Sequence, residues 1–252
     1  MSQSTQSTPI TALQQQHVTI RAFTDQPIPA EMVQALLDSG RRAPTSSNFQ
    51  TYSIIVVRDP AVKKELAVLA GNQKHVEVCP VFMAFCADIR RLEIACDMHG
   101  LSLAKSLETS MVSTVDAALV GMSVQTAAES FGLGAVMIGG MRNHPDQVAD
   151  LLGFPPGVFV VYGMCIGWPE PEKVPAQKPR LPEEVVVHYE KYNTADPREQ
   201  YQAYDRALAE HYGSQNRNLD EAAWTGVIAK GVSQPRRPDL RKTLEGMGFS
   251  FE

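Results

Sequence analysis

The hydrophobic positions along the chain follow two periods, one typical of helices and the other of buried strands. Apolar residues recur at helical spacing from Ile28 to about Arg42. Four short runs rich in β-branched and aromatic residues predict buried strands at 51–58, 81–87, 135–138 and 157–166. Both kinds of segment are therefore expected to contribute to the core.

The longest predicted helix, from about 101 to 131, carries small and apolar residues almost all around its axis. An apolar surface that complete has to be buried, either in the core or in a subunit interface. Gly132 follows this helix, and glycine is the residue type that most often caps a helix C-terminus.

Further helices are predicted on either side of the strands. Asp59 and Pro60 supply an N-cap and a first turn, and two more helices are expected at 143–152 and, with a polar surface, at 197–212. The Pro-rich stretch 168–182 predicts an extended surface segment, and the residues after the last helix an irregular arm. Helices outnumber strands and do not alternate with them regularly, which favours an α+β fold over a doubly wound sheet.

Length and composition narrow the class of protein. A chain of 252 residues can bury one sizeable core, and we expect a single domain with appendages. The net charge of −5 lacks the basic excess of a nucleic-acid binder, and no apolar run approaches the roughly 20 residues of a membrane span. The opening residues, MSQSTQSTPI, lack the basic and apolar regions of a signal peptide and read as a disordered polar tip.

The cysteines indicate the cellular compartment, and the histidines indicate whether a metal site is expected. The cysteines are scattered and form no C-x-x-C pair, which indicates buried free thiols in a reducing, cytoplasmic compartment. The histidines show no metal-binding spacing, so no metal is expected. The cysteines are Cys79, Cys86, Cys96 and Cys165.

Two glycine pairs invite different interpretations. Gly132-x-Gly134 lacks the third glycine of a dinucleotide fingerprint, and it ends a helix before a strand instead of leaving a strand for a helix. A Rossmann site is therefore rejected. Gly139-Gly140 stands at the exit of a predicted strand, where missing side chains let backbone N–H groups approach a planar ring.

Several polar clusters are each explained by an ordinary loop when taken alone. They are His17-Val18-Thr19-Ile20-Arg21, Thr45-Ser46-Ser47-Asn48-Phe49-Gln50, Gln73-Lys74-His75 and Lys178-Pro179-Arg180. The first is basic, and the second offers hydroxyls and amides. Together with the bare backbone at Gly139-Gly140, they suit a bound, phosphorylated, planar cofactor.

The order and spacing of these clusters resemble the oxygen-insensitive NAD(P)H nitroreductases and flavin reductases, in the larger FMN-dependent group that prefers NADPH. The resemblance extends from about His17 to Phe249. It rests on HVTIRAFTDQPIP, RRAPTSSNFQTYSIIVV, GNQKHV, TVDAALVGMSVQTAAESFGLGAVMIGGMRN, GMCIGWP, KPRLP and RRPDLRKTLEGMGF.

The resemblance implies an α+β, nitroreductase-like fold with a central, mostly antiparallel sheet flanked by helices. It also implies an interlocked homodimer with FMN at the interface. Residues 17–195 would form the FMN-binding domain, after a polar tip and the start of a first helix at 1–16. Residues 196–252 would form a C-terminal helix and arm that complete the dimer and the nucleotide or substrate site.

The resemblance also implies roles for individual residues. No catalytic side chain is expected because the flavin carries the chemistry, and Arg21 and Gly139 would tune its ring. The phosphate would be held by His17, Thr19, Lys178 and Arg180. The ring would be contacted by Arg21, Gln73, His75, Met137, Ile138, Gly139 and Gly140, and from the other subunit by Thr45, Ser46, Ser47, Phe49 and Gln50. Ser47, Asn48, Glu108, Arg217 and Arg237 would serve substrate or nucleotide.

Two departures from the family pattern affect these expectations. Val18 replaces an arginine that close relatives often carry, so one phosphate contact is missing. The loop 212–221, which is basic in relatives, keeps only Arg217 among several polar and acidic residues. Because arginine normally grips the 2′-phosphate of NADPH, we expect NADH to be a real substrate as well.

The expected function is FMN-dependent, NAD(P)H-consuming reduction of nitroaromatics, quinones or related electron-poor small molecules, by ping-pong hydride transfer. A NAD(P)H:flavin reductase that supplies free reduced flavin is an alternative, because one open ring face serves both reactions. A non-catalytic flavin-binding or redox-sensing protein is an alternative of another class, kept open by the weakened basic loop.

Overall fold

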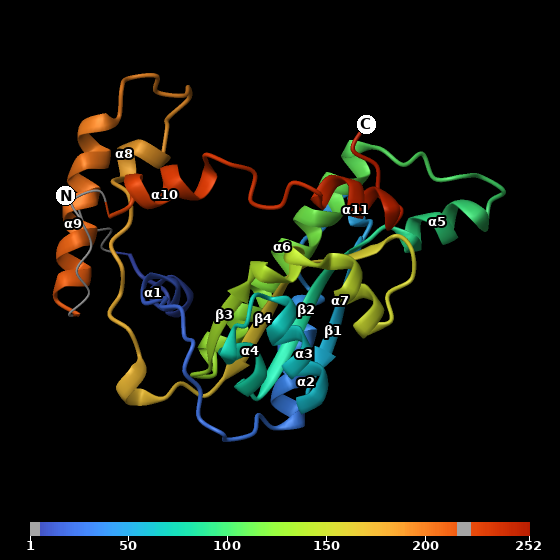
Figure 1. Ribbon diagram of the computed structural model, residues 1–252, viewed down its shortest axis with the longest axis horizontal. Helices are drawn as coiled ribbons and strands as arrows, with labels where there is room; N and C mark the ends of the chain where they lie inside the picture. The colour runs from blue at the N-terminus through green and yellow to red at the C-terminus, as the bar shows by residue number, and fades with distance from the viewer. Residues whose placement is uncertain (1–5, 216–222) are drawn as a thin grey trace. The chain divides into compact units, whose positions relative to one another are not determined.

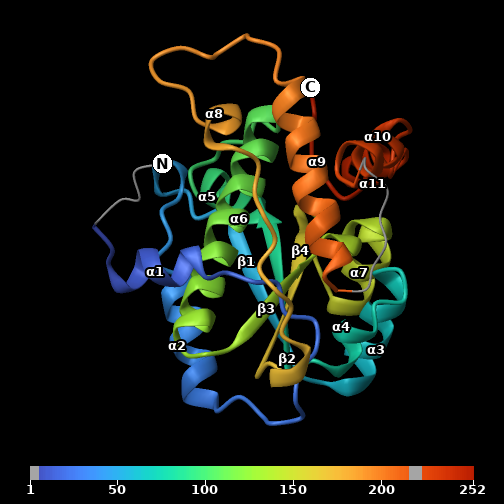
Figure 2. The same cartoon turned by 90° about the vertical axis from the view of Figure 1, so that its left-hand side faces the viewer.

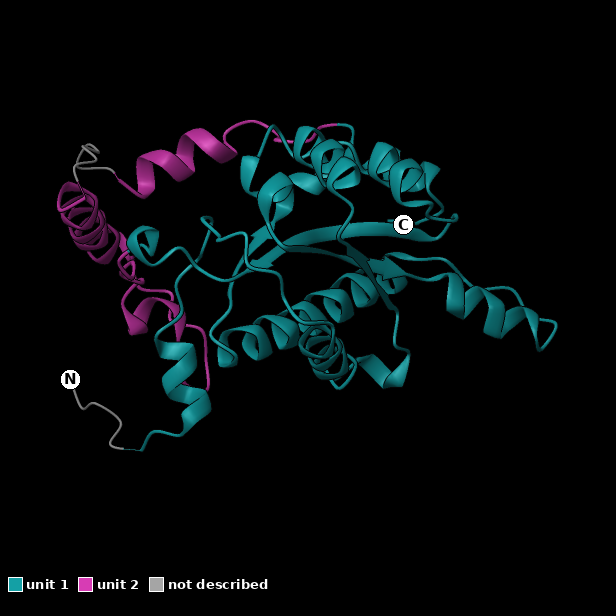
Figure 3. Cartoon of the chain, turned by 90° about the horizontal axis from the view of Figure 1, so that it is seen from below, with its two compact units in different colours: residues 1–175, 239–252 teal, residues 176–238 magenta. Residues whose placement is uncertain are grey.

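The computed structural model describes residues 6–215 and 223–252, which fall into two compact units. The first unit, here called the sheet unit, comprises residues up to Pro175 and from Asp239 to the C-terminus (Figure 3). The second, the helical unit, comprises Ala176–Pro238. No helix among the described residues is long and apolar enough to cross a membrane.

The sheet unit is built on four strands in the order β1-β2-β4-β3. Every neighbouring pair is antiparallel, and β1 and β3 form the two edges. The predicted strands and the antiparallel sheet are confirmed, with each strand end within one residue of its expected position. The strands are β1 (Tyr52–Val57), β2 (Val81–Asp88), β3 (Gly134–Ile138) and β4 (Val158–Gly167).

Helices cover both faces of the sheet because its central strands are apolar on both sides (Figure 1). Met83 and Phe85 of β2 pack into the core shared with α2 (Ala30–Gly40) and α6 (Leu107–Ser130). Phe82 and Ala84 pack into a second core on the opposite face. That core is shared with α3 (Pro60–Leu69), α4 (Lys74–Val78) and α7 (Pro145–Leu152).

The long helix α6 runs along one face of the sheet and contacts all four strands (Figure 2). It begins at 107 instead of the expected 101, because Ser106 and Thr109 form a capping box that fixes its N-terminus. Gly132 follows it at φ +80°, which confirms the predicted glycine C-cap.

Part of the apolar surface of α6 stays uncovered in a single chain. Five large side chains repeat every three or four residues along one side of the helix and are 40–54% exposed. We call this set the α6 stripe: Leu107, Met111, Val115, Leu119 and Met122. The core of the chain therefore buries only part of the apolar surface that the sequence expects to be covered by the core or by a subunit interface.

Several short helices were not expected. The first helix expected within 1–16 is present as α1 (Pro9–Gln15), behind a capping box of Thr8 and Thr11, so the opening segment is not simply a disordered tip. The predicted irregular arm is also wrong in part, since it contains α10 (Thr225–Val232) and α11 (Leu240–Gly246). The helices α5 (Arg90–Asp97) and α8 (Glu183–Val186) were not predicted either, and α4 lies in what was expected to be a loop.

The helical unit contains α8 (Glu183–Val186), α9 (Arg198–Gly213) and α10. The buried carboxylate of Asp205 on α9 accepts hydrogen bonds from the backbone N–H groups of Trp224 and Thr225, at 2.6 and 2.8 Å. Burial by itself raises the pKa of Asp205, but these bonds and that of the Thr225 hydroxyl outweigh it and lower the pKa. Asp205 therefore ties the start of α10 to α9.

Candidate functional site

The residues from His17 to Arg21, here called the 17–21 strip, follow α1 and contact the edge strand β3 at Ile20. The backbone N–H of Ile20 donates to the carbonyl oxygen of Ala135 at 3.1 Å, and the Ile20 side chain is buried. A Cβ added at Gly134 would lie 2.6 Å from Ile20, so the strip and the strand are in close contact. Along the strip Ile20 is buried, whereas His17 and Thr19 are half-buried and Arg21 is exposed.

The strand exit next to the strip contains the two glycines. A Cβ added at Gly140 would lie 2.4 Å from the carbonyl oxygen of Ala70 and 2.7 Å from Nε2 of Gln73. Gly140 is therefore required for packing against the end of α3, whatever its role toward a ligand. At Gly139 the three atoms nearest to an added Cβ all belong to the Arg142 guanidinium, the closest at 3.4 Å.

Gln73 and His75 lie at the same end of the sheet unit. Gln73 donates from Nε2 to the Ala70 carbonyl at 2.8 Å, beside Gly140. Burial lowers the pKa of His75, and the nearby positive charge of Arg21 lowers it further. The Nε2 atom of His75 is buried and has no hydrogen-bond partner within the described residues. A buried polar atom of this kind is costly unless a ligand or water satisfies it.

Three predicted clusters thus meet at the β3 edge: the 17–21 strip, the residues Met137–Gly140 and the pair Gln73 and His75. The Met137 side chain is 43% exposed and that of Ile138 is buried. At the end of β3 the strand therefore exposes the side chain of Met137 but only the backbone of Ile138. We call this assembly the β3-edge site. It combines a basic strip, an unpartnered buried ring nitrogen and a glycine-containing turn.

The segment from Thr45 to Gln50 lies elsewhere. It leads into β1, the opposite edge of the sheet, and three spacings of about 4.8 Å separate β1 from β3. Its residues from Ser46 to Gln50 are exposed. Ser47, Asn48 and Gln50 have φ of 46°, 58° and 53°, a left-handed conformation that residues other than glycine rarely adopt.

A single buried carboxylate fixes this strained loop at both ends. Asp116, fully buried on α6, accepts from the backbone N–H of Ser46 at 3.0 Å. Its other oxygen accepts from the backbone N–H and the hydroxyl of Thr51, at 3.0 and 2.8 Å. The loop conformation is therefore set by α6 from within the same chain.

Glu108 is also distant from the β3-edge site of its own chain. It is exposed in the first turn of α6, where an acid suits the helix dipole. The Glu129 carboxylate, near the other end of α6, lies 2.6 Å from Nδ1 of His17. Glu108 precedes Glu129 by about 30 Å along the helix axis.

The remaining predicted residues belong to the helical unit. Lys178 places its Nζ 5.4 Å from the ring centre of Tyr212, and the Tyr204 hydroxyl donates to the Pro179 carbonyl at 3.1 Å, next to Arg180. Arg237 is half-buried, and its pKa is lowered by burial and by the neighbouring charge of Arg236. Arg217 lies outside the described residues.

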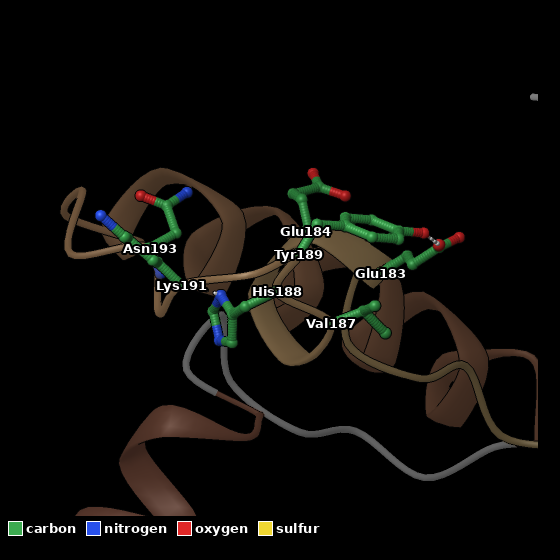
Figure 4. A pocket seen from close by; sticks show the side chains of 7 residues that line it. All are labelled: Glu183, Glu184, Val187, His188, Tyr189, Lys191 and Asn193. Atoms are coloured by element: carbon green, nitrogen blue, oxygen red, sulfur yellow. Dashed lines mark hydrogen bonds between the residues drawn. The ribbon is translucent and has the colours of Figure 1, made fainter.

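Two surface hollows lie away from these residues. One, in the helical unit, is lined by short polar and charged side chains around the Tyr189–Glu183 hydrogen bond of 3.4 Å (Figure 4). The other, of about 510 Å³, lies between α1 and the end of the α6 stripe, with Ile10, Leu119 and Met122 in its walls. The first has no buried charge and the second has no charged residue in its walls, so neither resembles a site for a charged cofactor.

Sequence reasoning missed three residues that organise these clusters: Asp116, Gln125 and Glu129. All three are polar side chains within a helix whose remaining surface is mostly apolar. A buried polar residue in such a helix is expected to have a partner, which is the signal that the sequence contained. The cysteine expectation holds for Cys79, Cys86 and Cys165, which are buried and free, whereas Cys96 is only half-buried.

Comparison with known proteins covers almost the whole chain. The model of the Nitroreductase family matches residues 15–168, and that of the Nitroreductase family, C-terminal domain, matches residues 178–252. The chain is 39% identical over 239 residues to an FMN reductase (NADPH) of Bacillus subtilis, which covers 93% of this chain and 95% of the relative.

Two further relatives agree in length and fold. An oxygen-insensitive NADPH nitroreductase of Salmonella typhimurium is 38% identical over 234 residues, covering 93% of this chain and 95% of that protein. The solved structure of NfrA2 from B. megaterium superimposes with a TM-score of 0.93 at 36% identity, covering 98% of this chain and all of that one.

Proposed function

The chain belongs to the nitroreductase family, and we propose that it is an FMN-dependent NAD(P)H oxidoreductase. Its acceptors would be nitroaromatics, quinones or related electron-poor small molecules. The observation that carries the proposal is the β3-edge site, where three clusters far apart in the sequence converge. The residues of this site would hold FMN, and the cofactor would supply the hydride-transfer chemistry between nucleotide and acceptor.

The residues of the β3-edge site fit the flavin. His17 and Thr19 would donate to the phosphate, together with Lys178 and Arg180 of the helical unit. Arg21 would stand at the pyrimidine edge of the ring, where its fixed charge stabilises negative charge on the reduced flavin. The buried, unpartnered Nε2 of His75 supports a ligand at this end, because the flavin would supply the hydrogen bond that the described chain does not.

The backbone from Met137 to Gly140 would lie along the ring. The side chain of Gln73 is held beside Gly140, so these residues form one wall. The backbone N–H of Gly139 would donate toward the N5 edge of the ring. These groups bind and orient; no side chain is needed as a nucleophile or a proton donor.

We also propose that the protein is a homodimer in which the partner completes each site. The α6 stripe exposes a continuous apolar surface, which a second copy would cover. The strained loop 45–50 and Glu108 lie far from the β3-edge site of their own chain, so they would serve the site of the partner. Thr45, Ser46, Ser47, Phe49 and Gln50 would then contact the flavin, and Ser47, Asn48 and Glu108 the substrate.

A flavin reductase is the second candidate, and one specific relative supports it. The B. subtilis protein at 39% identity is named an FMN reductase, so free flavin is a plausible acceptor for this chain as well. The free thiols fit a protein of the reducing cytoplasm, where either activity would operate.

Nucleotide choice would depend on Arg217 and Arg237. Arginine binds the 2′-phosphate of NADPH by paired, charge-assisted hydrogen bonds, and each lost contact weakens binding about tenfold or more. With few cations in the 212–221 loop, NADH should be a real substrate, and the preference for NADPH should stay below about a hundredfold. Arg217→Ala should remove most of any preference, and Arg237→Ala should weaken both nucleotides.

Rapid-mixing spectroscopy tests the proposal. The purified protein should contain FMN, and NADH and NADPH should each bleach its absorption near 450 nm before an acceptor is added. A panel of a nitroaromatic, a quinone and free FMN should then restore the colour. A protein that binds FMN but is bleached by neither nucleotide would be a flavin-binding protein without this activity.

A further inference from the structure

Behind the imidazole of His17 stands a small polar network from the end of α6. The Glu129 carboxylate oxygen Oε1 lies 2.6 Å from His17 Nδ1, and Gln125 Nε2 lies 3.0 Å from the same oxygen. Gln125 Nε2 is also 3.2 Å from Nδ1. Gln125 is 5% exposed, and the Glu129 side chain 13%. The two residues are four apart on one helix face. The Gln125 amide donates to the Glu129 oxygen, and that oxygen in turn holds the ring of His17.

Glu129 occupies a place that helix electrostatics disfavours. It lies in the last turn of α6, where the unpaired carbonyl groups make the helix end negative and no basic residue compensates. Burial adds a further cost, because a carboxylate loses hydration there. The contact with His17 offsets both costs. We therefore expect the role of Glu129 to be its interaction with the His17 imidazole.

The positions of the hydrogens follow from the chemistry of the partners. A carboxylate oxygen only accepts, so the short contact requires a hydrogen on Nδ1. A phosphate oxygen also only accepts, so a phosphate bound by the other nitrogen requires a hydrogen on Nε2 as well.

From this geometry we infer that Glu129, held by Gln125, is a positioning residue for phosphate binding. It fixes the ring of His17 so that Nε2 is the edge that donates to the FMN phosphate. The inference rests on the proposed FMN site. The network of Gln125, Glu129 and His17 should therefore strengthen binding of the FMN phosphate. It should have no effect on binding of the isoalloxazine ring.

The test compares FMN with riboflavin, which has the same ring and no phosphate. Dissociation constants of both are measured on flavin-free full-length protein by flavin fluorescence. Glu129→Gln should weaken FMN about tenfold, the effect of one lost charge-assisted hydrogen bond, and leave riboflavin unchanged. Glu65→Gln removes an exposed carboxylate from α3 of the same unit and serves as the matched control, without effect on either ligand.

A double-mutant cycle with His17→Ala separates positioning from folding. Once the imidazole is absent, adding Glu129→Gln should not weaken FMN any further. Gln125→Met keeps the size of the side chain but loses its donor, and it should give a smaller, FMN-specific loss if Glu129→Gln fails to fold.

Equal weakening of FMN and riboflavin in these variants, or an effect that persists without His17, would overturn the positioning role. Unchanged FMN affinity in Glu129→Gln would do the same. A wild-type protein that binds FMN no more tightly than riboflavin would instead contradict the phosphate site of the proposed function, so the two failures are distinguishable.

Discussion

At the scale of single residues, Arg21 and His75 illustrate how one charge shapes its surroundings. Arg21 stands on the exposed side of the 17–21 strip, yet its charge reaches His75 on α4 and lowers the pKa of that ring beyond the effect of burial. An arginine cannot lose its proton in a protein, so this charge is permanent. The two residues therefore give the β3-edge site one fixed cation beside one neutral imidazole.

The first prediction concerns Arg21 and the flavin. Arg21→Ala should lower the reduction potential by about 20–60 mV, because a cation that favours the anionic reduced ring is lost. Redox titration against a reference dye measures it. Lys64→Ala, which removes an exposed positive charge from α3, should leave the potential unchanged. An unchanged potential in an Arg21→Ala protein that still binds FMN would place Arg21 away from the ring.

The second prediction concerns pH. Since the pKa of His75 is lowered in the folded protein from an ordinary value of 6.5, the unfolded chain takes up this proton first as the pH falls. The free energy of unfolding should therefore decrease below about pH 6.5, down to the folded pKa.

His75→Gln should flatten this decrease, and urea unfolding of the flavin-free protein at several pH values measures the difference. The other histidines are present in both proteins, so their contributions cancel. A decrease of the same size in both proteins would contradict the prediction.

At the scale of elements, the loop 45–50 and the helix α6 form one unit of structure. Three residues of the loop hold left-handed backbone, which costs about 1–3 kcal/mol each unless the surroundings enforce it. Asp116 supplies that enforcement from the middle of α6. Because the loop is exposed, its strain contributes nothing to the core, which supports a role toward a partner or a ligand.

The third prediction follows from this arrangement. Asp116→Asn replaces an oxygen with a donor that faces an N–H group, and it should cost on the order of 2–4 kcal/mol of stability. It should also weaken FMN binding, although no contact between Asp116 and the flavin is proposed. Urea unfolding and flavin titration measure the two effects, with the exposed Asp38→Asn as control. Full stability and full FMN affinity in Asp116→Asn would show that the loop does not depend on it.

At the scale of the whole molecule, the residues proposed to contact the flavin are divided between the two edges of the sheet. The β3-edge site gathers the basic strip, the glycine turn and His75, whereas the loop 45–50 adjoins the opposite edge of the sheet. One four-stranded sheet cannot bring its two edges to one small ring. A second copy docked on the α6 stripe would resolve this separation.

The fourth prediction is a yellow homodimer with about one FMN per chain. Met111→Glu buries a charge in the proposed interface and should abolish the dimer and FMN binding together. Val68→Glu on α3, an exposed apolar position on the other side of the sheet, is the matched control. Light scattering combined with flavin absorption reports both properties. A monomer that retains one FMN per chain would contradict the shared site.

Local sequence signals determined most of the elements. The ends of the four strands lie within one residue of their predicted positions. An apolar β-branched run bounded by turn residues is a local signal, which depends on only a few neighbouring residues. The same locality explains the errors. The helices α5 and α11 are short, and α11 is stabilised by burying Leu244 in the core formed by distant residues.

The order of the polar clusters along the chain was enough to identify the family, and the helix and strand signals were enough to predict the α+β fold. The comparisons confirm both. The individual site residues stay predictions. Only the tertiary structure decided which clusters meet, because proximity depends on strand order and not on separation along the chain. It joined His17 to Glu129 and His75 to Arg21, and it set the loop 45–50 at the opposite edge of the sheet.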